Sequence, residues 1–132
     1  DSGLMVPVIK DADKKSLLQL ALELGQLAQK AKTRKIGVDE LQGGSFTISN
    51  LGGFGVGHFT PIVNTPDVAI LGVGAGQPRP VVRKNKITRA LMLPLALSYD
   101  HRVIDGADGA RFMRSLVQAI EAVTESQIKK DK

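Results

Sequence analysis

The sequence predicts an α/β fold in which β-strands pack against helices. Two segments carry apolar residues at three- and four-residue intervals, which is typical of helices with one buried face. Between them, residues 68–73 form a continuous apolar run of the kind found in fully buried strands. The 132-residue chain has 42% hydrophobic and 23% charged residues, so we expect a globular protein with one core, built mainly from aliphatic side chains.

The first elements are an apolar stretch and a helix. Residues 4–9 are apolar and end at a Lys-Asp pair, which predicts the end of a strand. Residues 14–33 are expected to form the first helix, with Asp13 as its N-cap. Its apolar positions follow the helical period at Leu17, Leu20, Leu24, Leu27, Ala28 and Ala31.

A strand and a glycine-rich loop follow. In residues 45–49, Phe46 and Ile48 fall on one side of an alternating pattern, which predicts a half-buried strand. Residues 51–57 contain too much glycine for regular structure, and we expect a loop with positive φ angles or close backbone contacts.

The second half of the chain is expected to contain a hairpin and a helix. Residues 80–83 and 87–99 are predicted to pair around the polar turn at 84–86. Pro94 cannot donate a ladder hydrogen bond, so the second strand needs an edge or a bulge there. After Gly106, apolar residues recur at helical spacing to about residue 124.

Composition excludes several classes of protein. The chain has no cysteine, which rules out disulfides, thiolate metal sites and a cysteine nucleophile, and favours a cytosolic or organelle-matrix location. No apolar run is long enough to span a bilayer. The net charge of +5 comes from basic groups at residues 30–35, 79–89 and 129–132. A solvated surface is the favoured interpretation of these groups, and attraction of a polyanionic small molecule is the next.

The glycine loops do not match nucleotide-binding fingerprints. Both read G-x-G-x-G, at residues 53–57 and 72–76. A Rossmann loop needs its third glycine one position later, and a P-loop needs Gly-Lys-Ser/Thr. We therefore do not expect these loops to bind a nucleotide.

The segment Ser-Tyr-Asp-His-Arg-Val-Ile-Asp-Gly, residues 98–106, lies between a predicted strand end and a predicted helix start. A histidine side chain has an unperturbed pKa of about 6.5, so a neutral His101 could accept a proton from a reacting group. Asp105, four residues on, could orient this region. From the residues alone, a structural role for His101 is the favoured interpretation, and a catalytic role is the alternative.

Residues 100–106, Asp-His-Arg-Val-Ile-Asp-Gly, resemble the active-site signature Asp-His-Arg-x-x-Asp-Gly of the dihydrolipoyl acyltransferases of 2-oxo acid dehydrogenase complexes. The shorter His-x-x-x-Asp-Gly core is shared with chloramphenicol acetyltransferase and with peptide-synthetase condensation domains. The family resemblance continues, in the same order along the chain, at residues 3–9, 46–52, 61–64 and 68–73.

The resemblance implies a mechanism. His101 would act as a general base that deprotonates the thiol of coenzyme A or of dihydrolipoamide. Ser49 matches the family serine that donates a hydrogen bond to the oxyanion; its alternative is a hydroxyl that caps the glycine loop. Asp105 matches a position that holds the histidine region in shape, by orientation or a salt bridge. Asp100 and Arg102 complete the signature without an assigned role, and His58 is expected to be exposed and incidental.

The resemblance also implies an architecture: a two-layer sandwich of mixed β-sheet and helices like that of chloramphenicol acetyltransferase, truncated at its N-terminal side. Residues 1–126 would be the C-terminal half of the catalytic domain and residues 127–132 a basic tail. Coenzyme A and dihydrolipoamide would be substrates, with no metal and no tightly bound cofactor, and the lipoyl group would sit on a domain absent from this chain.

The implied partners are two further copies in a homotrimer that builds a larger cage, with histidine and serine meeting between chains, and the lipoyl domains and other subunits of the complex. No nucleic acid or membrane partner is expected. The location would be the bacterial cytoplasm or the mitochondrial matrix. Residues 60–64 and 89–94 look most like pyruvate-type acetyltransferases. Succinyl or branched-chain specificity, or a catalytically silent oligomerisation fragment, are the alternatives.

Overall fold

The computed structural model describes residues 3–124 and 128. The chain divides into two compact units, one formed by residues 1–44 with 115–132 and the other by residues 45–114. The predicted basic tail at 127–132 lies outside the described residues, apart from Ile128. Within the described part, no helix combines the length and the hydropathy needed to cross a bilayer.

The first unit is built on helix α1, Leu17–Lys32, preceded by the 3-10 turn η1, Ala12–Lys14, and followed by η2, Val38–Glu40. The predicted helix is confirmed, but its predicted N-cap, Asp13, is wrong because Asp13 lies within η1. The cap is Ser16, whose Oγ accepts from the Gln19 amide at 3.2 Å while its own amide donates to Gln19 Oε1 at 2.8 Å. Because this capping box satisfies two backbone donors at once, the helix begins there.

The predicted strand at residues 4–9 is also wrong. These residues form no strand, and their backbone makes one hydrogen bond within the described part, from the Val8 amide to the Glu40 carbonyl at 2.8 Å. A strand needs a neighbouring strand along its length, and η2 offers this segment a single acceptor. Apolar composition alone therefore did not decide its conformation.

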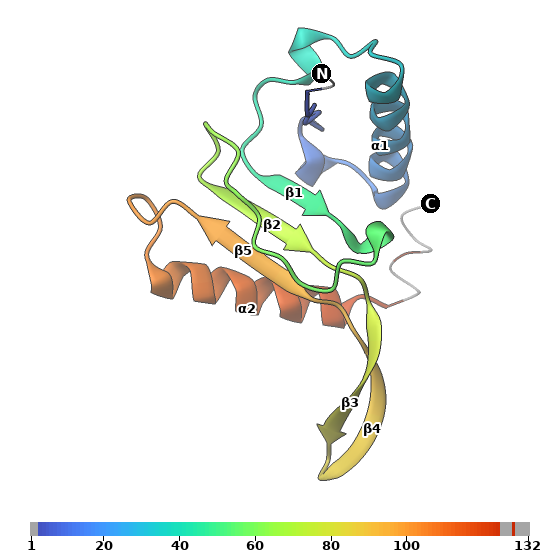
Figure 1. The fold of residues 1–132 in the computed structure, drawn as a ribbon, viewed down its shortest axis with the longest axis vertical. Coiled ribbons are helices and arrows are strands. Elements are labelled where there is room, and N and C mark those ends of the chain that lie inside the picture. Colours follow the sequence, from blue (N-terminus) through green and yellow to red (C-terminus); the bar gives the residue numbers. More distant parts are fainter. Residues whose placement is uncertain (1–2, 125–127, 129–132) are drawn as a thin grey trace. The chain divides into compact units, whose positions relative to one another are not determined.

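The second unit contains a three-stranded mixed sheet, and this part of the prediction is confirmed. Its strands are β1 (Thr47–Asn50), β2 (Ala69–Val73) and β5 (Leu95–Tyr99), in the order β1-β2-β5. β2 runs parallel to β1 and antiparallel to β5. β2 lies between β1 and β5 (Figure 1), and four of its five residues are buried, as the continuous apolar run predicts.

Strand β1 is half-buried as predicted, but its buried residue is not one of the expected pair. Thr47 is buried and Ile48 is 64% exposed, while Phe46 precedes the strand and its ring lies 5.7 Å from that of Phe112. Thr47 can be buried because its hydroxyl donates to Asp67 Oδ2 at 2.6 Å.

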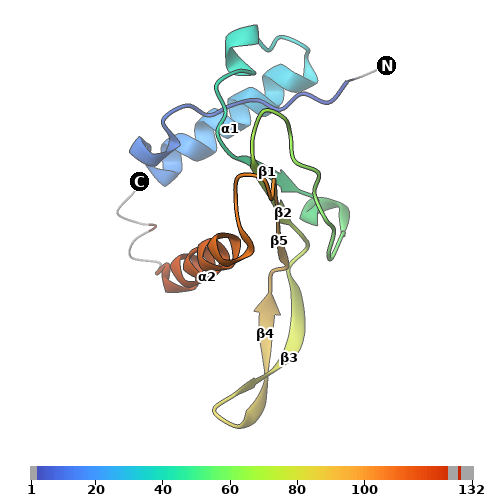
Figure 2. The same ribbon diagram turned by 90° about the vertical axis from the view of Figure 1, so that its left-hand side faces the viewer.

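Helix α2, Gly106–Ala122, confirms the second predicted helix. Its first turns lie against strand β5, since a Cβ atom added at Gly109 would be 2.8 Å from Tyr99 Cε1 (Figures 1 and 2). The sheet and this part of the helix form the two layers of an α/β arrangement.

Strands β3 (Gln77–Arg83) and β4 (Lys86–Met92) form a separate two-stranded sheet that extends away from β1, β2 and β5 (Figures 1 and 2). The predicted turn is confirmed: Lys84 and Asn85 have φ angles of 50° and 58°, which fit a type I′ hairpin. The predicted second strand is broken at Pro94, which separates β4 from β5 and accepts a hydrogen bond from the Gly74 amide at 3.0 Å.

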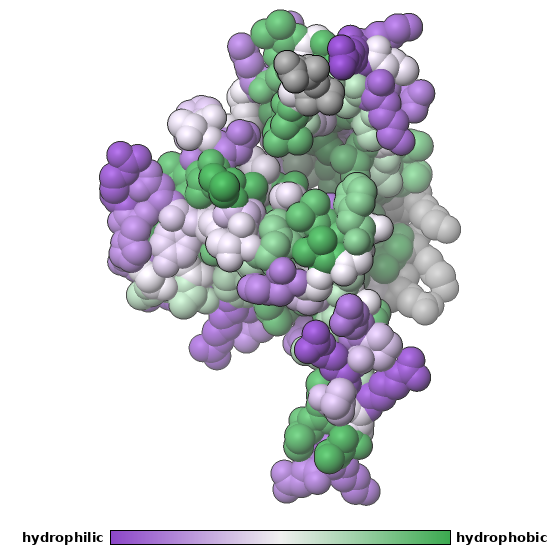
Figure 3. Space-filling view, in the orientation of Figure 1, coloured by the Kyte–Doolittle hydropathy of each residue, from purple (hydrophilic) through white to green (hydrophobic). Residues whose placement is uncertain are grey.

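The two faces of this hairpin differ in character. The register places Val82 opposite Ile87 on one face, together with Leu91, and these side chains are 71%, 80% and 74% exposed. Arg89 lies on the same face, and the other face carries the cations Arg79, Arg83 and Lys86 together with Val81 and Met92. Hydrophobic and hydrophilic side chains thus alternate along the hairpin surface (Figure 3). A lone two-stranded hairpin is marginally stable in water, so an exposed apolar face calls for a covering partner.

The glycine-rich loop behaves as predicted. It contains the 3-10 turn η3, Gly52–Phe54, and Gly55 has a φ of 78°. The chain then passes very close to the end of β2, because a Cβ atom at Gly74 would be 2.1 Å from the Gly57 carbonyl oxygen. Only glycine allows this approach.

We expect Gly74→Ala to lower the free energy of unfolding by about 1–3 kcal/mol, since the added methyl group must push the loop away. Gly53→Ala is the matched control, because a Cβ atom there meets nothing within 4 Å. Urea denaturation of both variants measures the difference. Equal unfolding midpoints would show that the close approach is not required.

Candidate active site

The predicted histidine lies in a short loop, residues 100–105, that joins β5 to α2. Asp100 organises the backbone of this loop. Its amide donates to the Val68 carbonyl at 2.8 Å, and its carbonyl accepts from the amides of Val103 and Ile104, both at 3.0 Å. The loop is therefore fixed on one side to Val68, the residue before β2, and its own hydrogen bonds close it on the other side.

The Asp100 side chain holds the loop a second time, through Arg102. Oδ1 accepts from the Arg102 backbone amide at 2.9 Å and from Nε at 3.0 Å, and Oδ2 accepts from Nη2 at 2.6 Å. Hydrogen bonding to Arg102 lowers the pKa of Asp100 to about 2, from an ordinary value of 3.8, and the same pair raises the pKa of Arg102. Asp100 and Arg102 thus fix the loop on both sides of His101.

His101 itself is exposed. Its imidazole lies beside the Tyr99 ring, with 5.8 Å between ring centroids and 45° between ring planes. Among the described residues, no hydrogen bond reaches either imidazole nitrogen, and Tyr99 is the ring contact that His101 makes. Both nitrogens are therefore open to a reacting group.

Asp105 ends the loop as the cap of α2. Its Oδ1 accepts from the Asp108 amide at 2.9 Å, and its carbonyl accepts from the Gly109 amide at 3.1 Å. In the described part of the chain it forms no salt bridge, since the ion pair of this segment joins Asp100 to Arg102. The contacts of Asp105 agree with the other role expected of it, which is to orient the loop.

Ser49 lies at the opposite end of the sheet from His101. It pairs with Gly72, which pairs with Ala96, whereas Tyr99 pairs with Ala69 at the other end of β2. Three strand residues correspond to about 10 Å, and His101 lies beyond Tyr99. One copy of the chain therefore does not bring the predicted serine and histidine together.

His58 is exposed, as predicted, in the loop that follows the glycine-rich segment. The described residues contain no group of three or more His, Asp or Glu side chains that could hold a metal ion. At residues 99–105, the exposed imidazole of His101 is a group that can act as a base.

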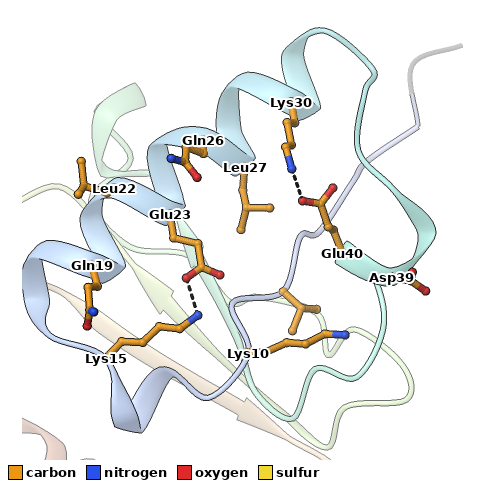
Figure 4. A pocket seen from close by; sticks show the side chains of 11 residues that line it. Lys10, Lys15, Gln19, Leu22, Glu23, Gln26, Leu27, Lys30, Asp39 and Glu40 are labelled. Carbon is orange, nitrogen blue, oxygen red and sulfur yellow. Dashed lines mark hydrogen bonds and ion pairs between the residues drawn. The ribbon is translucent and has the colours of Figure 1, made fainter.

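The first unit contains a cavity of about 600 Å³ between α1, η2 and the segment at Val8. Two ion pairs lie in its lining, Lys15 with Glu23 and Lys30 with Glu40, each at 2.5 Å, and Lys10 and Asp39 also line it (Figure 4). None of the predicted site residues lines it.

The chain matches a known protein family over almost its whole length. The profile of the family "2-oxoacid dehydrogenases acyltransferase (catalytic domain)" matches residues 1–128. The chain belongs to this family. The dihydrolipoyllysine-residue acetyltransferase component of the Azotobacter vinelandii pyruvate dehydrogenase complex is 57% identical over 86% of the chain. The corresponding component of the acetoin cleaving system of Bacillus subtilis is 47% identical over 92%.

Solved structures of the acyltransferase family share the fold. Dihydrolipoamide acetyltransferase from Azotobacter vinelandii is 58% identical, with a TM-score of 0.84 over 86% of the chain and 47% of that structure. A probable dihydrolipoamide acetyltransferase from Listeria monocytogenes is 37% identical, with a TM-score of 0.90 over 93% of the chain and 53% of that structure. The predicted fold class is confirmed.

The chain spans 18% and 30% of the length of the two curated acyltransferases, and about half of each solved structure. Its features are therefore those of a part of the family's catalytic domain.

The sequence interpretation missed Tyr99 as a member of the site. The signal was available: Tyr99 stands two positions before His101 at the end of a predicted strand. Alternate residues of an extended chain point to the same side, so the two rings could have been expected to meet.

We expect Arg102→Met to raise the pKa of Asp100 from about 2 toward 3.8, because the cation that stabilises the carboxylate is gone. The folded-state pKa is lowered, so the pair stabilises the fold above the ordinary value and this contribution is lost as pH falls toward about 2. Carboxyl ¹³C titration by NMR measures the pKa of Asp100. Arg111→Met, which removes the partner of Asp108, is the control and should leave Asp100 unchanged; an unmoved Asp100 midpoint in Arg102→Met would contradict the assignment.

Proposed function

We propose that this chain provides the general base for transfer of an acetyl group between dihydrolipoamide and coenzyme A. The observation that carries the proposal is His101, exposed and without a hydrogen-bond partner among the described residues, on a loop that Asp100 and Arg102 hold in place. Family membership and the acetyltransferase names of the relatives in pyruvate and acetoin systems favour acetyl as the group transferred.

The chemistry requires a base because a thiol with a pKa near 8.5 is mostly protonated at neutral pH. The imidazole of His101 removes the proton from sulfur, and the thiolate attacks the thioester carbonyl carbon. The oxyanion then collapses, the original carbon–sulfur bond breaks, and the imidazolium returns its proton to the departing thiolate. Atoms and charges balance without a metal ion or a tightly bound cofactor; coenzyme A and dihydrolipoamide are substrates.

Ser49 is assigned to the oxyanion by its position in the chain. The Azotobacter vinelandii acetyltransferase was investigated for the role of a serine, a histidine and an asparagine in its catalytic mechanism. In that protein these three residues are separated by the same numbers of positions as Ser49, His101 and Asp105 here. Aspartate replaces asparagine in this chain, and both side chains can cap a helix, so Asp105 is assigned to shaping the loop.

We propose further that Ser49 and His101 act together across two copies of the chain. Their separation within one copy requires a second chain to complete the site. The exposed apolar face of the β3–β4 hairpin offers a surface for assembly, and one solved relative, 57% identical, is the cubic core of a pyruvate dehydrogenase multienzyme complex. The proposed assembly is a homotrimer that builds a larger cage and receives acetyl groups from separate lipoyl domains in the bacterial cytoplasm or mitochondrial matrix.

We expect His101→Ala to lower kcat about 10²- to 10⁴-fold, as loss of a general base does. Ser49→Ala should lower it about 10²- to 10³-fold, as loss of one oxyanion donor does. His58→Ala is the matched control, since it removes an exposed histidine outside the loop, and should leave the rate unchanged. The assay is acetyl transfer from acetyl-coenzyme A to dihydrolipoamide by the assembled protein. Undiminished turnover in His101→Ala would end the proposal, and no transfer by the unsubstituted protein would favour a silent scaffold.

We expect the double change Val82→Glu and Ile87→Glu to dissociate the assembly, because it places two charges on the apolar face of the hairpin. The molar mass from light scattering should fall at least about threefold, the ratio of a trimer to a monomer. Gln77→Glu with Thr88→Glu is the control, adding the same charge to the opposite face. An unaltered mass in the first variant would rule out this face as a contact between copies.

A further inference from the structure

The orientation of the His101 ring is not fixed by the contacts that fix its loop. Asp100 and Arg102 hold the backbone on both sides of it, but the imidazole makes no hydrogen bond among the described residues. A base must present one nitrogen to the thiol within hydrogen-bond reach and at a defined angle. Some other contact must therefore limit rotation of the ring.

Tyr99 makes that contact. The two rings lie 5.8 Å apart at 45°, within the range of distances and tilts at which aromatic rings attract one another. No other aromatic ring of the described residues pairs with His101. Contact with the Tyr99 ring on one side limits the rotations that are open to the imidazole.

Tyr99 is itself held on two sides. As the last residue of β5, it pairs with buried Ala69 of β2. On the other side its ring lies against α2, where a Cβ atom at Gly109 would be 2.8 Å from Cε1 and 3.1 Å from Cζ. Any larger residue at position 109 would displace the tyrosine ring, so glycine is what allows the helix to press on it.

The hydroxyl of Tyr99 lies toward α2. It would be 3.4 Å from a Cβ atom at Gly109 and 3.9 Å from one at Gly106. The contact recorded with His101 is between the two rings, so we expect it to need an aromatic ring but no phenol.

We propose that Tyr99 is a positioning residue for His101, aligning the imidazole for proton transfer, and that Gly109 permits this alignment by letting α2 clamp the tyrosine ring. The inference rests on the proposed function and adds to it a chain of contacts from helix to strand to base. Neither residue touches the substrate in this scheme, so their substitution should change the rate of the chemical step more than substrate binding.

The test compares Tyr99→Leu with Tyr99→Phe in acetyl transfer by the assembled protein. Tyr99→Leu removes the ring and should lower kcat about 3- to 10-fold, the effect of one aromatic pair, with KM little changed. Tyr99→Phe restores the ring and should recover most of the loss. The imidazole proton shifts of His101 in NMR spectra should move in Tyr99→Leu, which lacks the ring current, and stay near their original values in Tyr99→Phe.

Gly109→Ala provides a second and independent variant, which also serves if Tyr99→Leu fails to fold. It should lower kcat to a similar extent, and combining it with Tyr99→Leu should add little, because both act through the same ring. Full kcat in Tyr99→Leu, or in Gly109→Ala, would overturn the inference. So would a Tyr99→Phe variant as slow as Tyr99→Leu, which would place the effect in the hydroxyl. If any of these results is found while the His101→Ala protein is inactive, the inference about Tyr99 fails and the proposed function stands. An active His101→Ala protein would instead remove the proposed function itself.

Discussion

The pairing of β2 with both of its neighbours is the constraint on which the second unit depends. β2 is buried along almost its whole length, runs parallel to β1 and runs antiparallel to β5. Because of these directions, the carboxyl end of β1 and the carboxyl end of β5 lie at opposite ends of the sheet. Ser49 stands near the first and His101 follows the second, so the separation of the two residues is a consequence of strand direction.

This geometry links the chemistry to assembly. A catalytic pair that strand direction separates within one chain can operate when a second copy supplies the missing member. In the proposed assembly, the hairpin of β3 and β4 contributes a face that exposes Val82, Ile87 and Leu91 to water in the single chain. Burying apolar area of this kind stabilises a contact between chains.

The sequence predicts those parts of the structure that depend on a repeated local pattern. Both helices, the buried strand β2 and the turn at Lys84 and Asn85 follow from periodicity or from turn chemistry. Prediction from the sequence fails where two residues compete for one structural role, or where a segment needs a neighbouring segment to pair with. Asp13 and Ser16 are both acceptable caps, and the side chain of Gln19 decides for Ser16. Residues 4–9 have the composition of a strand, but a strand also needs a neighbour.

The candidate site divides in the same way. His101 is recognisable from a short motif, since the motif is local. Its surroundings are not, because they come from three elements that meet only in the folded chain: the end of β5, the loop closed by Asp100, and the first turns of α2. Gly109 illustrates the difference. In the sequence it is one glycine within a helix, where glycine ordinarily weakens the structure by about 1 kcal/mol relative to alanine. In the fold it is the position at which the helix reaches the ring beside the base, and this close approach explains why a poor helix former stands there.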